Sequence, residues 1–184
     1  MTVFEDTMID KKRAYEELLI AQTRLGDRNA AEALVAHRGP RLLVHATRLL
    51  GNRDEALDAV QEAWIEIFRG LKSLQTDAAF PVWALRIVSR KCARLIRTKQ
   101  RDRALPLEYE PQVHDPPPGQ SRDLARAIAA LPRQQAAAIA LFYLEDLSLA
   151  EVSIALDIPI GTVKSRLSLA RKTLKSTLEG DSHV

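Results

Sequence analysis

Apolar residues recur at every third or fourth position through most of the chain, the spacing that aligns them on one face of an α-helix. One instance comprises Leu57, Val60, Trp64, Ile67 and Leu71. No segment of the sequence has the sustained period-two alternation of β-branched residues that is typical of strands. Only seven of the 184 residues are glycine. We therefore expect an all-α protein.

The helical pattern is interrupted at length once, between residues 104 and 121. This segment, ALPLEYEPQVHDPPPGQS, holds five prolines and three acids but no lysine or arginine. Such a composition predicts a flexible, polyproline-like linker. We therefore expect two small helical domains, the second of four helices. The predicted divisions are an N-terminal extension (1–16), a first domain (17–103), the linker (104–121) and a second domain (122–184).

Within the first domain, glycine and proline mark the expected helix ends. The letters LGDRN indicate one break. A helix is expected to start after Gly39-Pro40 and to end at Gly51-Asn52, because proline favours helix starts and glycine favours helix stops. A longer helical pattern runs from Pro81 to about Gln100. Residues 1–15 are expected to form a frayed terminus.

The charges are sorted along the chain, although the net charge is only +3. Residues 86–103 hold eight bases and one acid, and residues 161–175 hold five bases and no acid. Residues 54–66 hold five acids and no base. Such segregation indicates partners more directly than the net charge does. We expect two basic surfaces that bind nucleic acid and one acidic surface that binds a basic protein.

The sequence contains no pattern that indicates catalytic or metal chemistry. The four histidines have no ligand-like spacing to one another or to the single cysteine, Cys92, and no phosphate-binding loop or nucleophile motif is present. We expect no catalytic residue, metal, cofactor or enzyme activity, and we expect Cys92 to be a small core residue. No run approaches the ~18 apolar residues of a membrane span, and the start lacks a signal-peptide core. A cytoplasmic protein without membrane insertion is therefore expected.

The second domain contains the pattern of a helix–turn–helix in LSLAEVSIALDIPIGTVKSRLSLARKTL. Ser148 and Glu151 are spaced as a capping box, Asp157 suits a left-handed turn position, and Pro159 restarts the chain. A solvated basic helix is the alternative. The short hydroxyl residues beside lysine and arginine, and the lengths of the preceding helix and turn, favour DNA binding. The residues expected to face DNA are Thr162, Lys164, Ser165, Arg166, Ser168 and Arg171.

The helix expected from Pro81 has a stripe of like charge. Its arginines, spaced by four, four and three residues, are Arg86, Arg90, Arg94 and Arg97. Like charges at this spacing destabilise an isolated helix by a few tenths of a kcal/mol per pair, so a stripe without compensating acids indicates an external polyanion. The opposite stripe, expected to face the core, is Leu85, Val88, Cys92 and Leu95. For Trp83 we favour core packing over stacking on bases.

Taken together, these segments resemble the extracytoplasmic-function (ECF) group of bacterial RNA polymerase sigma factors. The letters DAVQEAW and FPVWALRIVSRKCARLIR resemble the promoter-melting domain of that family, and LSLAEV with IPIGTVKSRLSLAR resembles its C-terminal domain. The resemblance implies promoter-specific transcription initiation. The implied partners are core RNA polymerase, through its clamp coiled coil and flap, promoter DNA, and an anti-sigma factor. It also implies a cytoplasmic, nucleoid-associated role of the kind that serves stress responses.

The resemblance also implies roles for particular residues. Asp58, Gln61 and Glu62 hold the positions that dock on the polymerase clamp. The second domain holds the −35 duplex, and the linker threads toward the RNA exit path. The residues at the −10-reading positions are Arg86, Arg90, Lys91, Arg94 and Arg97.

At three positions the sequence departs from the family pattern. Arg90 stands where an asparagine commonly helps to form the pocket for a flipped base, and Arg94 stands where an acid or amide is frequent. Phe142 replaces a residue that is often basic near the −35 contacts. We expect this chain to bind the melted −10 strand with less hydrogen-bond readout and with more attraction to phosphate.

Two other functions remain open from the sequence. A sigma-like decoy would bind an anti-sigma factor without reading DNA, and it would not need basic DNA-facing helices. A plain helix–turn–helix repressor would leave the first domain without a role.

Overall fold

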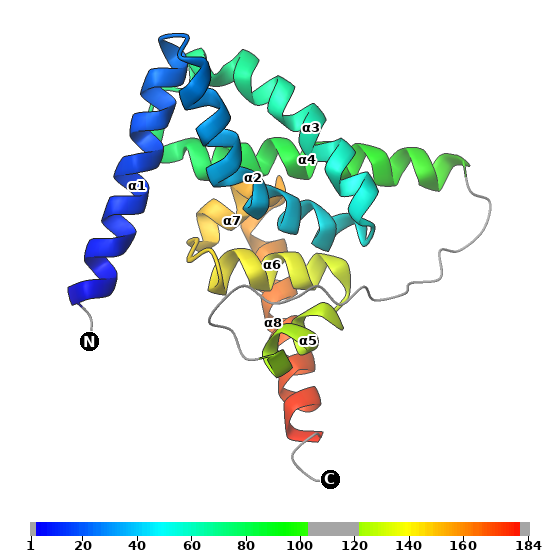
Figure 1. Cartoon of the computed structure of the whole chain (residues 1–184). Helices are drawn as coiled ribbons and strands as arrows, with labels where there is room; N and C mark the ends of the chain where they lie inside the picture. Colours follow the sequence, from blue (N-terminus) through cyan, green and yellow to red (C-terminus); the bar gives the residue numbers. More distant parts are fainter. Residues whose placement is uncertain (1–2, 103–121, 181–184) are drawn as a thin grey trace.

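The computed structural model describes residues 3–102 and 122–180, which form eight α-helices, two short 3-10 helices and the turns between them (Figure 1). These two ranges contain no strand, so the all-α prediction is confirmed. The predicted linker (104–121) lies outside the described residues.

The first half of the chain, residues 3–102, is a helical bundle. Helix α2 contacts α1, α3 and α4, and α3 also contacts α4. The elements in chain order are α1 (Val3–Arg24), α2 (Arg28–Leu50), α3 (Arg53–Gly70), η1 (Leu71–Ser73), η2 (Asp77–Ala79) and α4 (Phe80–Asp102).

Polar caps fix the ends of these helices where the sequence predicts them. The Asp27 carboxylate accepts hydrogen bonds from the backbone N–H groups of Asn29 and Ala30 at the start of α2. Gly51 ends α2 in the left-handed conformation, with φ +69°, and Asn52 caps α3 through the N–H of Glu55. The break within LGDRN and the stop at Gly51-Asn52 are therefore confirmed.

Two expectations for the first half are wrong. Helix α2 runs through Pro40 without a break rather than starting there. Pro40 removes one backbone N–H from the helix, and the residue four positions earlier, Ala36, is exposed, so water can reach the carbonyl that loses its partner. The frayed terminus expected for residues 1–15 is wrong as well, because residues 3–15 belong to helix α1.

Charged side chains hold α1 in place. Arg38 of α2 donates two hydrogen bonds to the Glu16 carboxylate, at 2.6 and 2.5 Å, and both side chains are less than a tenth exposed. At the other end of α1, Arg24 donates to the carbonyls of Leu71 and Leu74. These contacts tie α1 to α2 and to the η1 segment.

The core of the first half lies beneath α4. Leu85, Val88 and Cys92 are at most 3% exposed and Leu95 is half-buried, as expected for the apolar stripe. Trp83 packs against this core, and a Cβ atom added at Gly70 would lie 2.9 Å from its ring. The core predictions for Cys92 and Trp83 are confirmed.

The second half, residues 122–180, is a four-helix unit in which α8 contacts α5, α6 and α7. Helices α7 and α8 form the predicted helix–turn–helix. The elements are α5 (Arg122–Ala129), α6 (Arg133–Tyr143), α7 (Leu149–Leu156) and α8 (Ile160–Gly180).

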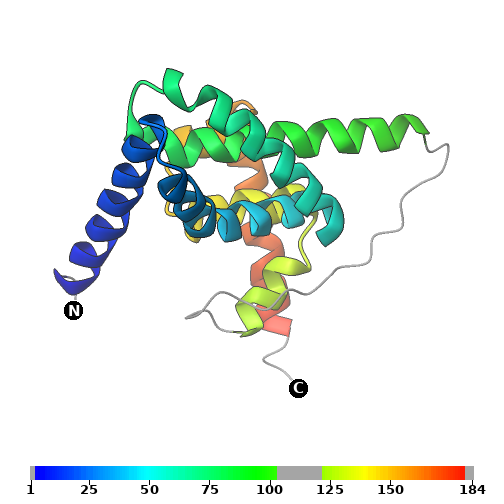
Figure 2. The same cartoon turned by 45° about the horizontal axis from the view of Figure 1, so that its top comes forward.

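The two halves pack directly against each other, an arrangement that was not predicted. Helix α7 lies against α4 and helix α6 against α2, so the second half sits on one side of the first-half bundle, as both views show (Figures 1 and 2). The buried apolar side chains of the two halves form one contiguous cluster.

The buried Glu16–Arg38 pair yields a stability prediction. Removing one partner leaves a buried charge uncompensated, so we expect Arg38→Met to lower the free energy of unfolding by about 3–5 kcal/mol in urea titrations. The double variant Glu16→Leu/Arg38→Met should regain most of that loss. The matched control is Arg28→Met in the exposed Arg28–Glu32 pair, expected to cost less than about 1 kcal/mol. Equal losses for Arg38→Met and Arg28→Met would contradict the prediction.

His45 yields a prediction about pH. Its Nε2 lies 2.8 Å from the Ser89 Oγ between α2 and α4, and burial, with a smaller effect of the Arg48 charge, lowers the pKa of His45 to about 3. Below the ordinary pKa of about 6.5 the unfolded chain binds a proton that the folded chain excludes. The stability contributed by neutral His45 is therefore present above pH 6.5 and is lost as the pH falls toward 3.

We expect the free energy of unfolding to fall by no more than about 1.4 kcal/mol per pH unit. His45→Gln should reduce this pH dependence in urea titrations between pH 6.5 and 4. Ser89→Ala is the control, because it removes the hydrogen-bond partner but no titrating group and so leaves the pH dependence unchanged. A His45→Gln variant with the wild-type pH dependence would exclude His45 as its source.

Candidate nucleic-acid interface

The helix–turn–helix is built from local interactions that the sequence predicts. The Ser148 side chain accepts from the N–H of Glu151, and the Glu151 carboxylate accepts from the N–H of Ser148, which completes the capping box. Asp157 adopts the left-handed conformation, with φ 54°, and the Ser153 hydroxyl donates to the carbonyl of Ile158 across the turn. These contacts fix the direction in which α8 leaves α7.

The position of α8 on the second half determines which of its side chains can reach a ligand. Val163, Leu167 and Ala170 are buried against the other helices of this half. Of the six predicted DNA-facing residues, four are exposed and Thr162 and Arg166 are half-buried. The four exposed residues are Lys164, Ser165, Ser168 and Arg171.

Arg166 differs from the other predicted DNA-facing residues. Its guanidinium donates to the Gln134 side chain of α6 at 2.8 Å, and burial lowers its pKa from the ordinary value. In this structure Arg166 therefore joins α8 to α6.

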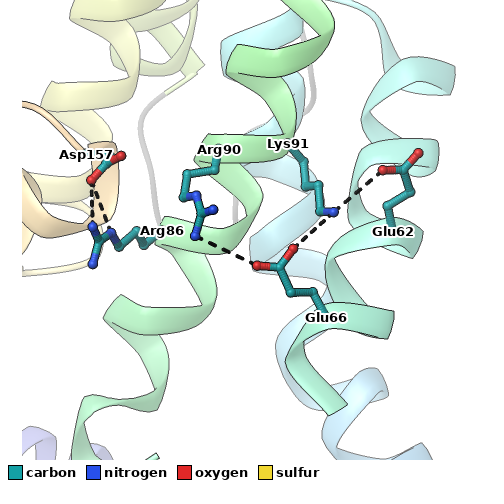
Figure 3. Close-up of polar contacts among 6 residues, drawn as sticks. All are labelled: Glu62, Glu66, Arg86, Arg90, Lys91 and Asp157. Carbon is teal, nitrogen blue, oxygen red and sulfur yellow. Dashed lines mark hydrogen bonds and ion pairs between the residues drawn. The ribbon is translucent and has the colours of Figure 1, made fainter. Parts of the chain in front are cut away.

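The basic residues of α4 lie between carboxylates on two sides (Figure 3). On one side, the Glu66 carboxylate lies 3.0 Å from Lys91 and 3.9 Å from Arg90, and Glu62 lies 3.8 Å from Lys91. Both acids belong to α3. The expectation of a basic stripe without compensating acids is therefore wrong for Arg90, because the acidic segment of residues 54–66 lies beside α4.

On the other side, the helix–turn–helix supplies an acid to α4. Nε and Nη2 of Arg86 donate to Oδ1 of Asp157 at 3.2 and 2.9 Å, and both side chains remain about half exposed. Arg94 and Arg97 are exposed farther along α4, where Arg97 donates to the carbonyl of Ala93. The C-terminal end of α4 that carries them extends past the neighbouring helices in both views (Figures 1 and 2).

Two acids at this interface, Glu66 and Asp157, were not identified as partners of α4 from the sequence. For Glu66 a signal existed, because an acidic helix and a basic helix in succession can pair when they pack side by side. For Asp157 the sequence offered none, since its partner Arg86 lies 71 residues away in the other half.

The residues expected to dock on a basic protein lie on the outer face of α3. Asp58 and Gln61 are exposed, and Glu62 is 62% exposed although it lies near Lys91. Next to them, Ile65 is 53% exposed and Phe68 is 37% exposed. The structure thus places the three predicted residues on one helix, beside apolar side chains that face solvent.

In residues 3–102 and 122–180, no three His, Cys, Asp or Glu side chains gather in a way that could hold a metal ion. None of the described helices is long and apolar enough to cross a membrane.

The two halves match two protein-family models. Residues 34–102 match sigma-70 region 2, and residues 121–174 match sigma-70 region 4. The first match covers α3, α4 and most of α2, and the second covers α5 to most of α8.

Curated relatives agree with these matches. The chain is 35% identical over 170 residues to the ECF RNA polymerase sigma factor SigM of Mycobacterium tuberculosis, covering 91% of this chain and 86% of SigM. It is 33% identical over 157 residues to SigE of Mycolicibacterium smegmatis, covering 80% of this chain but only 61% of SigE. The chain belongs to the extracytoplasmic-function group of RNA polymerase sigma factors.

The same fold occurs in a solved complex. The structure of the sigma factor RpoE with the anti-sigma factor NepR from Bartonella quintana matches with a TM-score of 0.66 and 24% identity. The match covers 80% of this chain and 96% of that chain.

Proposed function

We propose that this chain binds core RNA polymerase and directs transcription initiation at promoters that it recognises at the −35 and −10 elements. The observation that carries the proposal is the helix–turn–helix with its exposed basic and hydroxyl residues on α8, in the same chain as the acidic α3 and the basic α4. In this proposal residues 17–103 bind core RNA polymerase and the −10 element, and residues 122–184 bind the −35 element.

The −35 role rests on the chemistry of α8. Lys164 and Arg171 are exposed cations that can contact phosphates, and Ser165 and Ser168 are exposed hydroxyls that can contact base edges. A recognition helix contacts bases through its N-terminal turns. The −10 role rests on α4, whose cations Arg86, Arg90, Lys91, Arg94 and Arg97 can attract the phosphates of a melted strand.

Docking on the polymerase rests on the outer face of α3. Its exposed acids supply charge for a basic partner, and Ile65 and Phe68 supply apolar surface. Opposite charges steer association, whereas burial of apolar surface contributes much of the affinity. Asp58, Gln61 and Glu62 are the proposed contacts to the clamp coiled coil, and the second half is the proposed contact to the flap.

An anti-sigma factor is the proposed regulator. RpoE of Bartonella quintana was solved with its anti-sigma factor NepR. We place this chain in the cytoplasm, at the nucleoid when active, and we assign it no catalytic residue because its action is to bind and to position. In the decoy alternative the exposed cations of α8 would have no ligand.

Run-off transcription tests the proposal. With purified core RNA polymerase and genomic DNA of the source organism, the full chain should produce transcript starts that are absent without it. Lys164→Gln should lower the yield from those starts about fivefold or more, since one base or phosphate contact contributes ~1 kcal/mol or more. Lys72→Gln, at an exposed lysine of η1, should leave the yield unchanged. No dependent transcript start would overturn the proposal.

The basic character of the −10 surface yields a second prediction. Promoter binding by the wild-type holoenzyme and by an Arg90→Asn holoenzyme is measured across a salt series. Arg90 is exposed, and its guanidinium lies 3.9 Å from the Glu66 carboxylate, which is beyond hydrogen-bond distance. We therefore expect Arg90 to contact phosphate. Its loss should reduce the slope of log affinity against log salt concentration by about 0.7. Arg28→Asn removes an exposed arginine at the start of α2 and should keep the wild-type slope. An unchanged slope for Arg90→Asn would exclude this contact.

A further inference from the structure

An exposed leucine lies on the face of α8 that is proposed to contact DNA. Leu169 is 56% exposed, whereas Val163 and Leu167 of the same helix are 0% and 4% exposed. Ser165, two residues from each of these buried side chains, lies about 160° from them around the helix, since 3.6 residues make one turn. Leu169 is only about 40° around the helix from Ser165. It therefore stands near the middle of the solvent face, among the polar residues of the proposed −35 surface.

Smaller residues precede Leu169 on the same side of α8. Gly161, Ser165 and Leu169 follow one another at intervals of four residues, which places them in one row along the helix. A Cβ atom added at Gly161 would meet no atom within 4 Å, so the space beside this glycine is open. Short side chains at the first two positions allow the start of α8 to come close to a binding partner. Leu169 is the one member of the row that extends far from the helix.

The polar residues of this face have limited capacity to distinguish one base from another. The Ser165 hydroxyl donates to the carbonyl of Thr162 at 3.0 Å, so in this structure its proton is already used. Toward DNA its oxygen accepts, and both adenine and cytosine present an amino donor in the major groove. Lys164 lies about 100° from Ser165, at the flank of the face, where a cation is suited to phosphate rather than to base edges.

An apolar side chain on this face can supply the missing discrimination. Thymine presents a C5-methyl group in the major groove, and the other three bases do not. Packing that methyl group against a leucine removes apolar surface of both from water. Such a contact favours thymine over cytosine without using charge or hydrogen bonds.

We propose that Leu169 is a specificity-determining residue of the −35 surface, whose side chain packs on the C5-methyl group of a thymine in the major groove. The inference rests on the proposed function of α8 and names the base that this helix selects at one position. Continuity with the exposed Ser165 and Ser168, both in the proposed −35 set, favours DNA over a protein as the partner of Leu169.

Replacing thymine by deoxyuridine tests the contact, because it removes the C5-methyl group and leaves the base pairing unchanged. The probe is a fluorescein-labelled promoter fragment mapped by run-off transcription, with each thymine of the −35 region replaced in turn on either strand. Binding is measured with holoenzyme assembled from core RNA polymerase and the full chain. For the wild type, uracil at one position should lower the affinity about three- to fourfold, the effect of losing one buried methyl group.

Three variants identify the residue that makes the contact. Leu169→Ala should abolish the difference between thymine and uracil at that position, because its side chain ends short of the methyl group. Leu169→Met keeps an apolar side chain of similar length and should keep the difference. Leu25→Ala, at a leucine that is 88% exposed just after α1, should also keep it. Each comparison is a ratio of affinities within one protein, so the amount of folded protein does not alter it.

Two results would overturn the inference alone. A wild-type holoenzyme that binds thymine and uracil fragments equally at every −35 position makes no methyl contact. Equal uracil effects in the wild type and in Leu169→Ala would assign the contact to another residue, as expected if Leu169 contacts a protein instead. A wild-type holoenzyme that binds no promoter fragment would overturn the proposed function itself.

Discussion

The burial of one face of α4 determines the orientation of the basic residues that the proposed function requires. Leu85, Val88 and Cys92 pack into the core beneath α2 and α3, and full burial of a Leu or Val side chain contributes about 1.5–3 kcal/mol. A helix with this apolar stripe cannot rotate about its axis without exposing it. The opposite face, with Arg90, Arg94 and Arg97, is consequently held toward solvent.

Helix α4 would be less stable if all of its charged side chains were unpaired. Its cations lie one turn apart and repel one another. Glu62 and Glu66 of α3 and Asp157 of the turn reduce that repulsion from two sides, as Figure 3 shows. Because Arg86 and Asp157 are both about half exposed, their pair contributes little to stability, and this carboxylate can be replaced by another anion at small cost.

Features that depend on neighbouring residues in the sequence were predicted well. The capping box of Ser148, the left-handed Asp157 and the stop at Gly51 all follow from interactions within a few residues, and each occurs in the structure. Pro40 shows the limit of such local preferences. Proline favours a helix start, but the packing of α2 along its whole length keeps the helix continuous through Pro40. The frayed terminus expected for residues 1–15 was wrong because those from Val3 onward continue the same helix as Glu16, which Arg38, a partner 22 residues away, anchors to α2.

The candidate site was predictable in its residue types but not in its pairing. Spacing placed Lys164, Ser165 and Arg171 on the outer face of α8, where the structure has them. Spacing within one helix carries no information about which acid of another helix lies opposite, so Glu66 and Asp157 were missed. The packing of the two halves was missed as well, because the intervening segment of residues 104–121 predicts separation and gives no signal for contact.

The chemistry of Cys92 has a consequence for the oxidation of this protein. Burial raises the pKa of its thiol to about 12, so the thiolate that reacts with peroxides or disulfides is scarce at any physiological pH. Cys92 is also the single cysteine of the sequence, so no second thiol of this chain can resolve an oxidised form. The core position of Cys92 in α4 therefore protects its thiol from oxidation while the chain is folded.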